Sequence, residues 1–351
     1  MFASLSLPLL IVIFGGAASA VWVSGTRLSD TTDVLSKRFG FGEAFGGLIL
    51  LAVATNLPEI AITASAALSG ELGIAVGNIL GGIALQTVVL VALDAFGIGA
   101  AAPLTFRAAT LILVLEGVLV MAVLVLVIMT AQLPKTLTIG PVEPGAVAIV
   151  LAWGAGLWLL GKARTDLPWQ EKGAAPESQD RKTDADKDQK RGETSTARTI
   201  VVFTTAALVT LAGGVVLERS GNLIAGDVGM SGVLFAATVL AAATALPELS
   251  TGLAAVRIGD VQLAVSDIFG GNAFLPVLFL EAGLISGTAV LPQAQPSDLY
   301  LAGLGALLTA VYVFGLIFRP RRQVWRLGFD SWIVLLLYVV GIVGLVAIAR
   351  S

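Results

Sequence analysis

Long runs of apolar residues, separated by short polar stretches, set the strongest limit on what this chain can fold into. A helix needs about 20 mostly apolar residues to cross a bilayer, and lipid favours helices because they bond their own backbone groups. Ten such runs lie at 6–26, 43–68, 71–96, 107–130, 143–162, 198–218, 230–256, 260–285, 298–318 and 330–350. The sequence therefore predicts an all-α integral membrane protein with ten transmembrane helices.

The residue types that the chain lacks exclude several kinds of chemistry. It contains no His and no Cys, so imidazole and thiolate ligands and Ser-His or Cys-His catalytic pairs are excluded. Any bound cation must then be held by oxygen, which suits hard ions such as sodium, magnesium and calcium. The net charge of −3 and the lack of a basic face with interleaved aromatics predict no nucleic-acid partner. No cofactor is expected, and the partners are small inorganic cations and the lipid bilayer.

A polar stretch divides the chain into a first five-helix repeat at 1–162, a charged linker at 163–197 and a second five-helix repeat at 198–351. Besides the linker cations, the loops on the linker side carry Arg27, Lys37, Arg38, Arg107, Arg257, Arg319, Arg321, Arg322 and Arg326. The opposite side carries Lys135, Arg219 and Arg350. Because cations mark the cytoplasmic side, we expect a cytoplasmic linker, both termini outside and a prokaryotic plasma membrane. No Lys or Arg precedes the first run, so we expect it to be a span rather than a cleaved signal.

A six-residue motif occurs twice, as Ala-Thr-Asn-Leu-Pro-Glu at 54–59 and as Ala-Thr-Ala-Leu-Pro-Glu at 243–248. The offset of 189 residues (243 minus 54) persists without a gap for more than 30 residues, so that Gly70 corresponds to Gly259. The first copy begins on the second predicted span and the second copy on the seventh. An odd number of spans separates them, which predicts two inverted repeats, a recurrent plan of secondary transporters.

Four polar residues of the repeats are predicted to lie at the middle of the membrane. Each copy forms a helical hairpin, and Glu59 and Asn78 lie ten and eight residues from its turn (69 minus 59 and 78 minus 70). At about 1.5 Å per residue this depth is about 12–15 Å, near half of a bilayer core about 30 Å thick. Glu248 and Asp267 reach the same depth from the other side. No Lys or Arg lies at a comparable depth, so these carboxylates indicate a functional cation site.

Proline residues inside the repeated motif add backbone oxygens to this site. A proline in a helix removes the hydrogen bond to the carbonyl four residues earlier, so Pro58 and Pro247 are expected to free two carbonyls. Freed carbonyls at membrane depth are tolerated where they line a polar cavity. The predicted cation ligands are therefore Glu59, Glu248, Asp267, Asn78, the hydroxyls of Thr55 and Thr244, and the carbonyls of Ala54 and Ala243.

At these residues the sequence resembles the sodium/calcium exchanger family of the calcium/cation antiporter superfamily. The two repeats of that family read roughly Gly-Thr-Ser-Leu-Pro-Glu and then Gly-Asn-x-x-Gly-Ser-Asn, which residues 54–59 with 77–82, and 243–248 with 266–272, resemble. The resemblance implies that Glu59 and Glu248 are the chief calcium ligands, with Thr55 and Thr244 beside them and Asn78 and Asp267 at matching positions. It also implies alternating access, with the first and sixth spans sliding across a fixed core.

Several positions depart from the family pattern. The Ser before Leu-Pro-Glu is Asn56 in one copy and Ala245 in the other, and the hydroxyl before the Asn or Asp is Ile74 and Leu263. The first copy also ends in Ile83 where the family has Asn. Since several of these positions help to hold sodium in relatives, the divalent site is better preserved than the sodium sites.

The leading interpretation is a secondary-active antiporter that exchanges calcium for sodium, with no enzymatic activity. Because burial and mutual repulsion disfavour charged carboxylates, ligands left by calcium are expected to take up sodium or protons. A proton-coupled exchanger of divalent cations with the same fold is the alternative. A membrane-embedded hydrolase is a remote alternative, since catalysis rarely needs one motif in two opposite orientations, and a channel would be blocked by tight divalent binding. The divalent cation, the stoichiometry and the oligomeric state stay open.

Further polar residues lie inside the predicted spans. Glu116 is interpreted as a carboxyl capped by the hydroxyl of a neighbouring helix, with a proton relay as the alternative. Asp94 and Glu281 are near span ends, where placement at the membrane interface is expected. Gln86 and Asn272 are interpreted as polar groups that bond neighbouring helices, and Asn272 is near enough to the site to support it.

Overall fold

The computed structural model of this protein describes residues 5–39, 53–98, 102–138, 140–165, 195–257 and 259–349. Its first half comprises α1 (Leu7–Phe39), α3 (Leu57–Ser69), α4 (Leu72–Phe96), α5 (Leu104–Ala108), α6 (Leu111–Thr130), the short helix η1 (Lys135–Leu137) and α7 (Pro144–Thr165). The second half begins with α9 (Thr196–Asp227), α10 (Gly232–Phe235), the π-helix η2 (Ala236–Leu240), α11 (Ala241–Thr244) and α12 (Leu246–Arg257). It continues with α13 (Val261–Phe274), η3 (Leu275–Val277), α14 (Leu278–Ser286), η4 (Leu291–Gln293), α15 (Pro296–Phe318), the strands β1 (Gln323–Val324) and β2 (Leu327–Gly328), and α16 (Phe329–Ala349).

Helices match the apolar runs, and the chain is a multi-pass membrane protein. Within the described residues, eight helical segments are long and apolar enough to span a bilayer. A ninth span consists of the helices from Gly232 to Thr244 and from Leu246 to Arg257, which meet at a bend of 42°. The shorter helix α3 covers the described part of the run predicted at 43–68, whose first residues lie outside the described ranges. These elements are consistent with the ten predicted spans.

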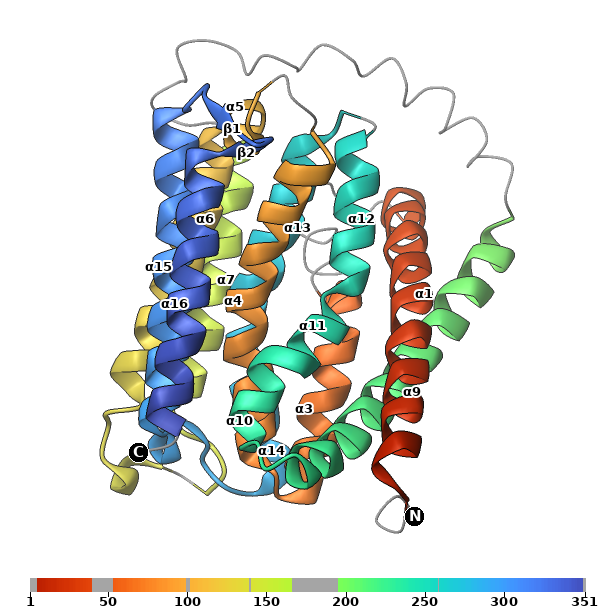
Figure 1. Ribbon diagram of the computed structural model, residues 1–351, viewed down its shortest axis with the longest axis vertical. Helices are drawn as coiled ribbons and strands as arrows, with labels where there is room; N and C mark the ends of the chain where they lie inside the picture. The colour runs from red at the N-terminus through yellow and green to blue at the C-terminus, as the bar shows by residue number, and fades with distance from the viewer. Residues whose placement is uncertain are drawn as a thin grey trace.

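The helices form a central group with a flank on either side (Figure 1). The two hairpins of the repeats, α3 with α4 and α12 with α13, lie in the centre, and α4 packs against α10 and η2 of the other half. On one flank α9 crosses α1 obliquely and packs against it, and on the other flank α15 packs on α6 and α16. Both chain termini lie at the same end of the molecule (Figure 1). The two halves are therefore interleaved rather than separate.

The hairpin turns have the same backbone geometry in both repeats. Gly70 and Gly259 adopt φ angles of 78° and 90°, in the left-handed region that a residue with a Cβ rarely enters. In the second turn the Asp260 side chain accepts a hydrogen bond from the Leu263 backbone N–H at 3.0 Å, a helix N-cap. The predicted turns are thus confirmed.

Two helices on one flank extend well beyond the predicted spans. Helix α1 continues to Phe39 and α9 to Asp227, whereas the apolar runs end at residues 26 and 218. The predicted spans end beside Arg27 and Arg219, because only apolar runs were taken as spans. A helix, however, continues as long as its backbone hydrogen bonds form, and charged side chains are good helix formers. The extra turns carry the flank past the apolar part of each span.

Asp94 lies near the end of α4, where it was predicted, and its side chain is buried inside the protein. Its side chain is 0% exposed and accepts hydrogen bonds from the backbone N–H of Leu104 at 2.8 Å and of Gly328 at 2.7 Å. The hydroxyl of Ser331 donates a third bond at 2.7 Å. These donors satisfy the buried carboxylate, so Asp94 ties the end of α4 to α5, β2 and α16.

Candidate cation site

The breaks in the two repeats place the acids of the repeated motif at the starts of helices. Helix α3 begins after a non-helical Asn56, and α12 begins after the 42° bend. Glu59 and Glu248 therefore lie in the first turns of α3 and α12. A proline fits in a first turn because the backbone N–H it lacks has no partner there. The positive end of the helix dipole stabilises a negative side chain at this position.

Glu59 receives polar contacts from both repeats. Its side chain is 0% exposed, and Nε2 of Gln86 donates to Oε1 at 3.5 Å, the long limit of a hydrogen bond. The hydroxyl of Thr244, from the second repeat, lies within hydrogen-bonding reach of the same carboxylate. That hydroxyl also lies 3.2 Å from the Ala241 carbonyl, while Oε2 of Glu59 is buried without a hydrogen-bond partner. The Thr244 hydroxyl can thus donate to either acceptor.

Glu248 is the least satisfied acid of the site. It is 4% exposed, and both of its carboxylate oxygens are buried without a hydrogen-bond partner. The charges of Glu59 and Asp267 both act unfavourably on it. Asn78 is 0% exposed, and its amide oxygen and nitrogen also lack partners. An unsatisfied buried polar group costs about 1–3 kcal/mol, so this concentration of acceptors is the feature that a bound cation would relieve.

The structure brings together some of the predicted ligands more clearly than others. Glu59 interacts with Thr244 and Glu248, and Glu248 interacts with Asp267. Thr55 is partly exposed and accepts a hydrogen bond from the neighbouring Asn56 amide at 3.4 Å. Ala54 and Ala243, whose carbonyls were predicted as ligands, are buried. In the described part of the chain no three acidic side chains are grouped closely enough to hold a metal ion by themselves, so neutral oxygens have to complete any coordination shell.

Gln86 contacts the site, although sequence reasoning gave it only a role in bonding helices. It lies 27 residues after Glu59 on α4, a helix that is apolar on nearly all sides, so no periodic pattern shows which face meets the acids. Asn272 does bond a neighbouring helix, because its amide donates to the Thr87 hydroxyl at 3.1 Å. The only sequence signal for Gln86 is a buried amide in an otherwise apolar span.

The repeated glycines allow close helix packing. A Cβ on Gly77 would lie 2.7 Å from the Val233 carbonyl oxygen, and one on Gly81 would overlap Ala237. In the second repeat a Cβ on Gly271 would lie 3.3 Å from the Asn56 amide. Small residues in such positions let membrane helices approach each other. Packing thus accounts for these glycines.

Glu116 is capped as predicted. Its carboxylate accepts a hydrogen bond from the Ser266 hydroxyl on α13 at 2.9 Å, and the side chain is 4% exposed. Ser266 directly precedes Asp267 in the sequence, so this bond fixes the helix that carries one of the candidate ligands. Glu116 therefore supports the site from α6.

Comparison with known proteins gives consistent results. The family model for the sodium/calcium exchanger protein matches residues 9–161 and 198–347. The chain is 25% identical over 321 residues to the inner membrane protein YrbG of Escherichia coli strain K12, covering 90% of this chain and 93% of YrbG. Among solved structures, the H⁺/Ca²⁺ exchanger CAX has a TM-score of 0.69 at 16% identity, covering 97% of this chain and 85% of CAX. The sodium-calcium exchanger NCX_Mj has a TM-score of 0.56 at 18% identity, covering 96% and 99% of the two chains.

Proposed function

Since the chain belongs to the sodium/calcium exchanger protein family, whose members are cation exchangers and not enzymes, we propose that it exchanges calcium for sodium at Glu59 and Glu248. One observation carries the proposal: buried carboxylate oxygens from both inverted repeats meet without enough donors to satisfy them. A divalent cation neutralises two such carboxylates at once, and hard cations prefer oxygen ligands. Sodium bound in its place restores part of that neutralisation, which gives a physical basis for exchange.

The proposed coordination shell combines charged and neutral oxygens. Beyond the two glutamates it comprises Asp267, Asn78, Thr55, Thr244 and the carbonyls of Ala54 and Ala243. A site with neutral ligands binds calcium more weakly than one with carboxylates alone, because affinity in oxygen sites rises with the number of charged ligands and with rigidity. A transported ion has to leave as well as enter. Neutral ligands therefore suit transport better than storage.

Alternating access is proposed to arise from movement of α1 and α9 against the central helices. These two helices cross and pack against each other on one flank (Figure 1). They contact the first turns of α12 and α3 through glycine. A Cβ on Gly25 would lie 2.7 Å from Pro247, and one on Gly214 would lie 2.9 Å from the Pro58 carbonyl. At these two positions the backbones approach closely without a side chain on the moving helix. The linker is proposed to be cytoplasmic and the termini outside, on the charge asymmetry of the loops.

Proton coupling is a second candidate, and it is favoured by the residues that replace hydroxyls. Ala245 and Ile74 are buried at positions where the family pattern has oxygen donors. A Cβ on Gly232 would lie 3.1 Å from the Ile74 side chain, so hydrocarbon fills this position. Fewer oxygens weaken sodium sites, whereas a proton needs only the carboxylates.

Tracer flux in liposomes tests the proposal. The purified protein is reconstituted, and uptake of radioactive calcium is followed against an outward sodium gradient, an outward proton gradient or no gradient. Glu59→Gln and Glu248→Gln keep the side-chain shape and remove the charge, and they are run in parallel. Uptake that depends on the sodium gradient and is lost in both variants is the expected result.

The other outcomes are equally informative. Uptake driven by the proton gradient alone replaces the first proposal with the second. If no gradient drives calcium and the variants behave like the parent protein, the assignment to calcium fails and other cations have to be screened.

A further inference from the structure

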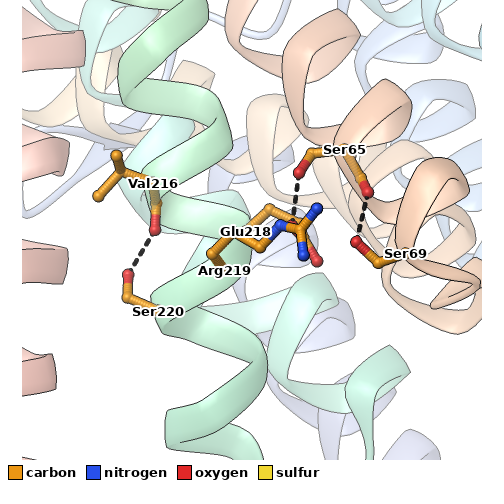
Figure 2. Close-up of polar contacts among 6 residues, drawn as sticks. All are labelled: Ser65, Ser69, Val216, Glu218, Arg219 and Ser220. Carbon is orange, nitrogen blue, oxygen red and sulfur yellow. Dashed lines mark hydrogen bonds and ion pairs between the residues drawn. The ribbon is translucent and has the colours of Figure 1, made fainter. Parts of the chain in front are cut away.

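Glu218 on α9 is a buried carboxylate that takes no part in the cation site. Its side chain is 0% exposed, and its Oε2 accepts a hydrogen bond from the Ser65 hydroxyl on α3 at 2.6 Å (Figure 2). Ser65 lies six residues beyond Glu59 (65 minus 59), or about 9 Å along the helix at about 1.5 Å per residue. The contact thus lies between the site and the Gly70 turn, in the half of the molecule toward the termini (Figure 1).

The carboxylate is only partly compensated. Nε of Arg219 lies 3.3 Å from Oε2, but the Arg219 side chain is 47% exposed and is shared with solvent. Oε1 is buried without a hydrogen-bond partner. Ser220 gives Glu218 no hydrogen bond, because its hydroxyl donates to the carbonyl of Val216 on its own helix (Figure 2). Burying a charge with so few partners is unfavourable.

Few other charges face Glu218. Glu71, in the turn between α3 and α4, acts on it unfavourably. The segment 232–244, which forms α10, η2 and α11, contains no charged residue. Helix α1 crosses α9 at a hydrogen bond of 2.7 Å between Ser24 and Thr210, and its charged residues all lie on the far side of that crossing from Glu218. Among the described residues, Glu71 and Arg219 are therefore the charges that act on it most directly.

The second repeat interface has no such group. The 189-residue offset relates Glu218 to Ser29 and Ser65 to Ala254 (218 minus 189, and 65 plus 189). Ser29 is partly exposed and Ala254 is exposed. The carboxylate is thus specific to the contact of α9 with α3, on one side of the inverted pair.

We propose that Glu218 is a proton-binding site that controls the contact between α9 and α3, and with it access to the cation site from the end where the termini lie. When α9 lies against α3, the buried carboxyl binds a proton on Oε1 and keeps the Ser65 bond on Oε2. When the contact opens to water, that proton dissociates. The opening equilibrium therefore rises with pH. The inference rests on the proposed function, because the opening has a role only if α1 and α9 move during transport.

Cysteine labelling tests the proposal without any transport. The chain has no native cysteine, so Ala61→Cys gives a single thiol on α3 at a position that is 5% exposed and faces Gly214 of α9. Its rate of reaction with a water-soluble maleimide in detergent is divided by that of Val228→Cys, an exposed position at the end of α9, at each pH. We expect the ratio to rise about tenfold from mildly acidic to mildly alkaline pH, since a tenfold change corresponds to one unit of difference in proton affinity.

Three further substitutions in the Ala61→Cys protein separate proton binding from packing. Glu218→Gln keeps the shape of the side chain but cannot ionise, so the ratio is expected to stay at its low value at every pH. Glu71→Gln is expected to move the midpoint to lower pH, and Arg219→Gln to higher pH. Opposite shifts of this kind do not arise from a structural role.

A pH dependence that persists in Glu218→Gln, or midpoints that do not move in the two charge variants, overturns the proposal. The charge variants keep Glu218 itself, so they decide the question even if Glu218→Gln does not fold. Labelling that follows the expected pattern in a protein that moves no calcium leaves the proton site intact and rejects the proposed function.

Discussion

The contact of α1 with α12 and the contact of α9 with α3 are two copies of one arrangement. In the first, Gly25 lies against Pro247, and in the second, Gly214 lies against Pro58. The offset of 189 relates both members of each pair (214 minus 25, and 247 minus 58). The polar groups differ, because the pair of Glu218 and Ser65 has no counterpart in the other contact. Close backbone packing is thus retained in both copies, while the chemistry beside it has diverged.

The largest expected effect tests whether the two motif glutamates remain equivalent. Glu59→Gln and Glu248→Gln are each expected to lower the apparent calcium affinity about 10- to 100-fold, since a hydrogen bond or ligand contact to a charged group is worth about 1.5–3 kcal/mol. Calcium-dependent uptake in liposomes measures the change. Similar losses mean that the site is shared evenly, and a loss confined to one variant breaks the symmetry.

The glycine contacts test the equivalence of the packing. Gly25→Ala and Gly214→Ala each place a methyl group about 2.7 Å from the facing helix, which is expected to destabilise the protein by about 1–3 kcal/mol. Thermal unfolding followed by tryptophan fluorescence measures the loss. Gly15→Ala and Gly226→Ala are matched controls on the same two helices, because nothing lies within 4 Å of either position.

The controls are expected to be neutral or stabilising, since alanine is the better helix former. If Gly25→Ala is as stable as Gly15→Ala, the contact of α1 with Pro247 is looser than described. A difference between Gly25→Ala and Gly214→Ala shows that the two contacts are not equivalent.

A charge exchange between the second helices of the hairpins gives a smaller effect. Asn78 and Asp267 occupy equivalent positions by the 189-residue offset. Asp267→Asn is expected to lower the apparent calcium affinity about tenfold through the loss of one charged ligand. The double variant Asn78→Asp with Asp267→Asn restores the net charge and is expected to recover most of the affinity. No recovery means that the charge is needed specifically on the second repeat.

Gln86 provides the smallest test, because its counterpart in the second repeat is Leu275 (86 plus 189). The Gln86→Leu substitution makes the first copy resemble the second. Its 3.5 Å bond to Glu59 is long, so we expect a loss of calcium affinity of about fivefold or less, corresponding to about 1 kcal/mol or less. An effect as large as that of Glu59→Gln indicates instead that the Gln86 oxygen is itself a ligand.

The sequence predicted the spans, the turns and the acids because each depends on local chemistry. A run of apolar residues, a glycine in the left-handed region and a proline in a helix act wherever they occur. The environment of Asp94 could not be predicted in this way, because its partners at Gly328 and Ser331 are more than 200 residues away. The contact between Gln86 and Glu59 was missed because α4 is buried on nearly every side, so its pattern does not mark one face. The ion-binding role of the predicted ligands stays a prediction until flux is measured.

The packing of α1 has a consequence for how the protein is made. Helix α1 is synthesised first, yet its most extensive contact is with α9, the first helix of the second half. Among the described helices, α1 packs mainly on α9 and α12 of the second half and only slightly on α3, so most of these partners are missing until the ribosome has delivered them. The two halves therefore cannot mature as successive domains in the way that many large proteins do. The first half has to remain in the membrane, inserted but incompletely assembled, until the second half arrives.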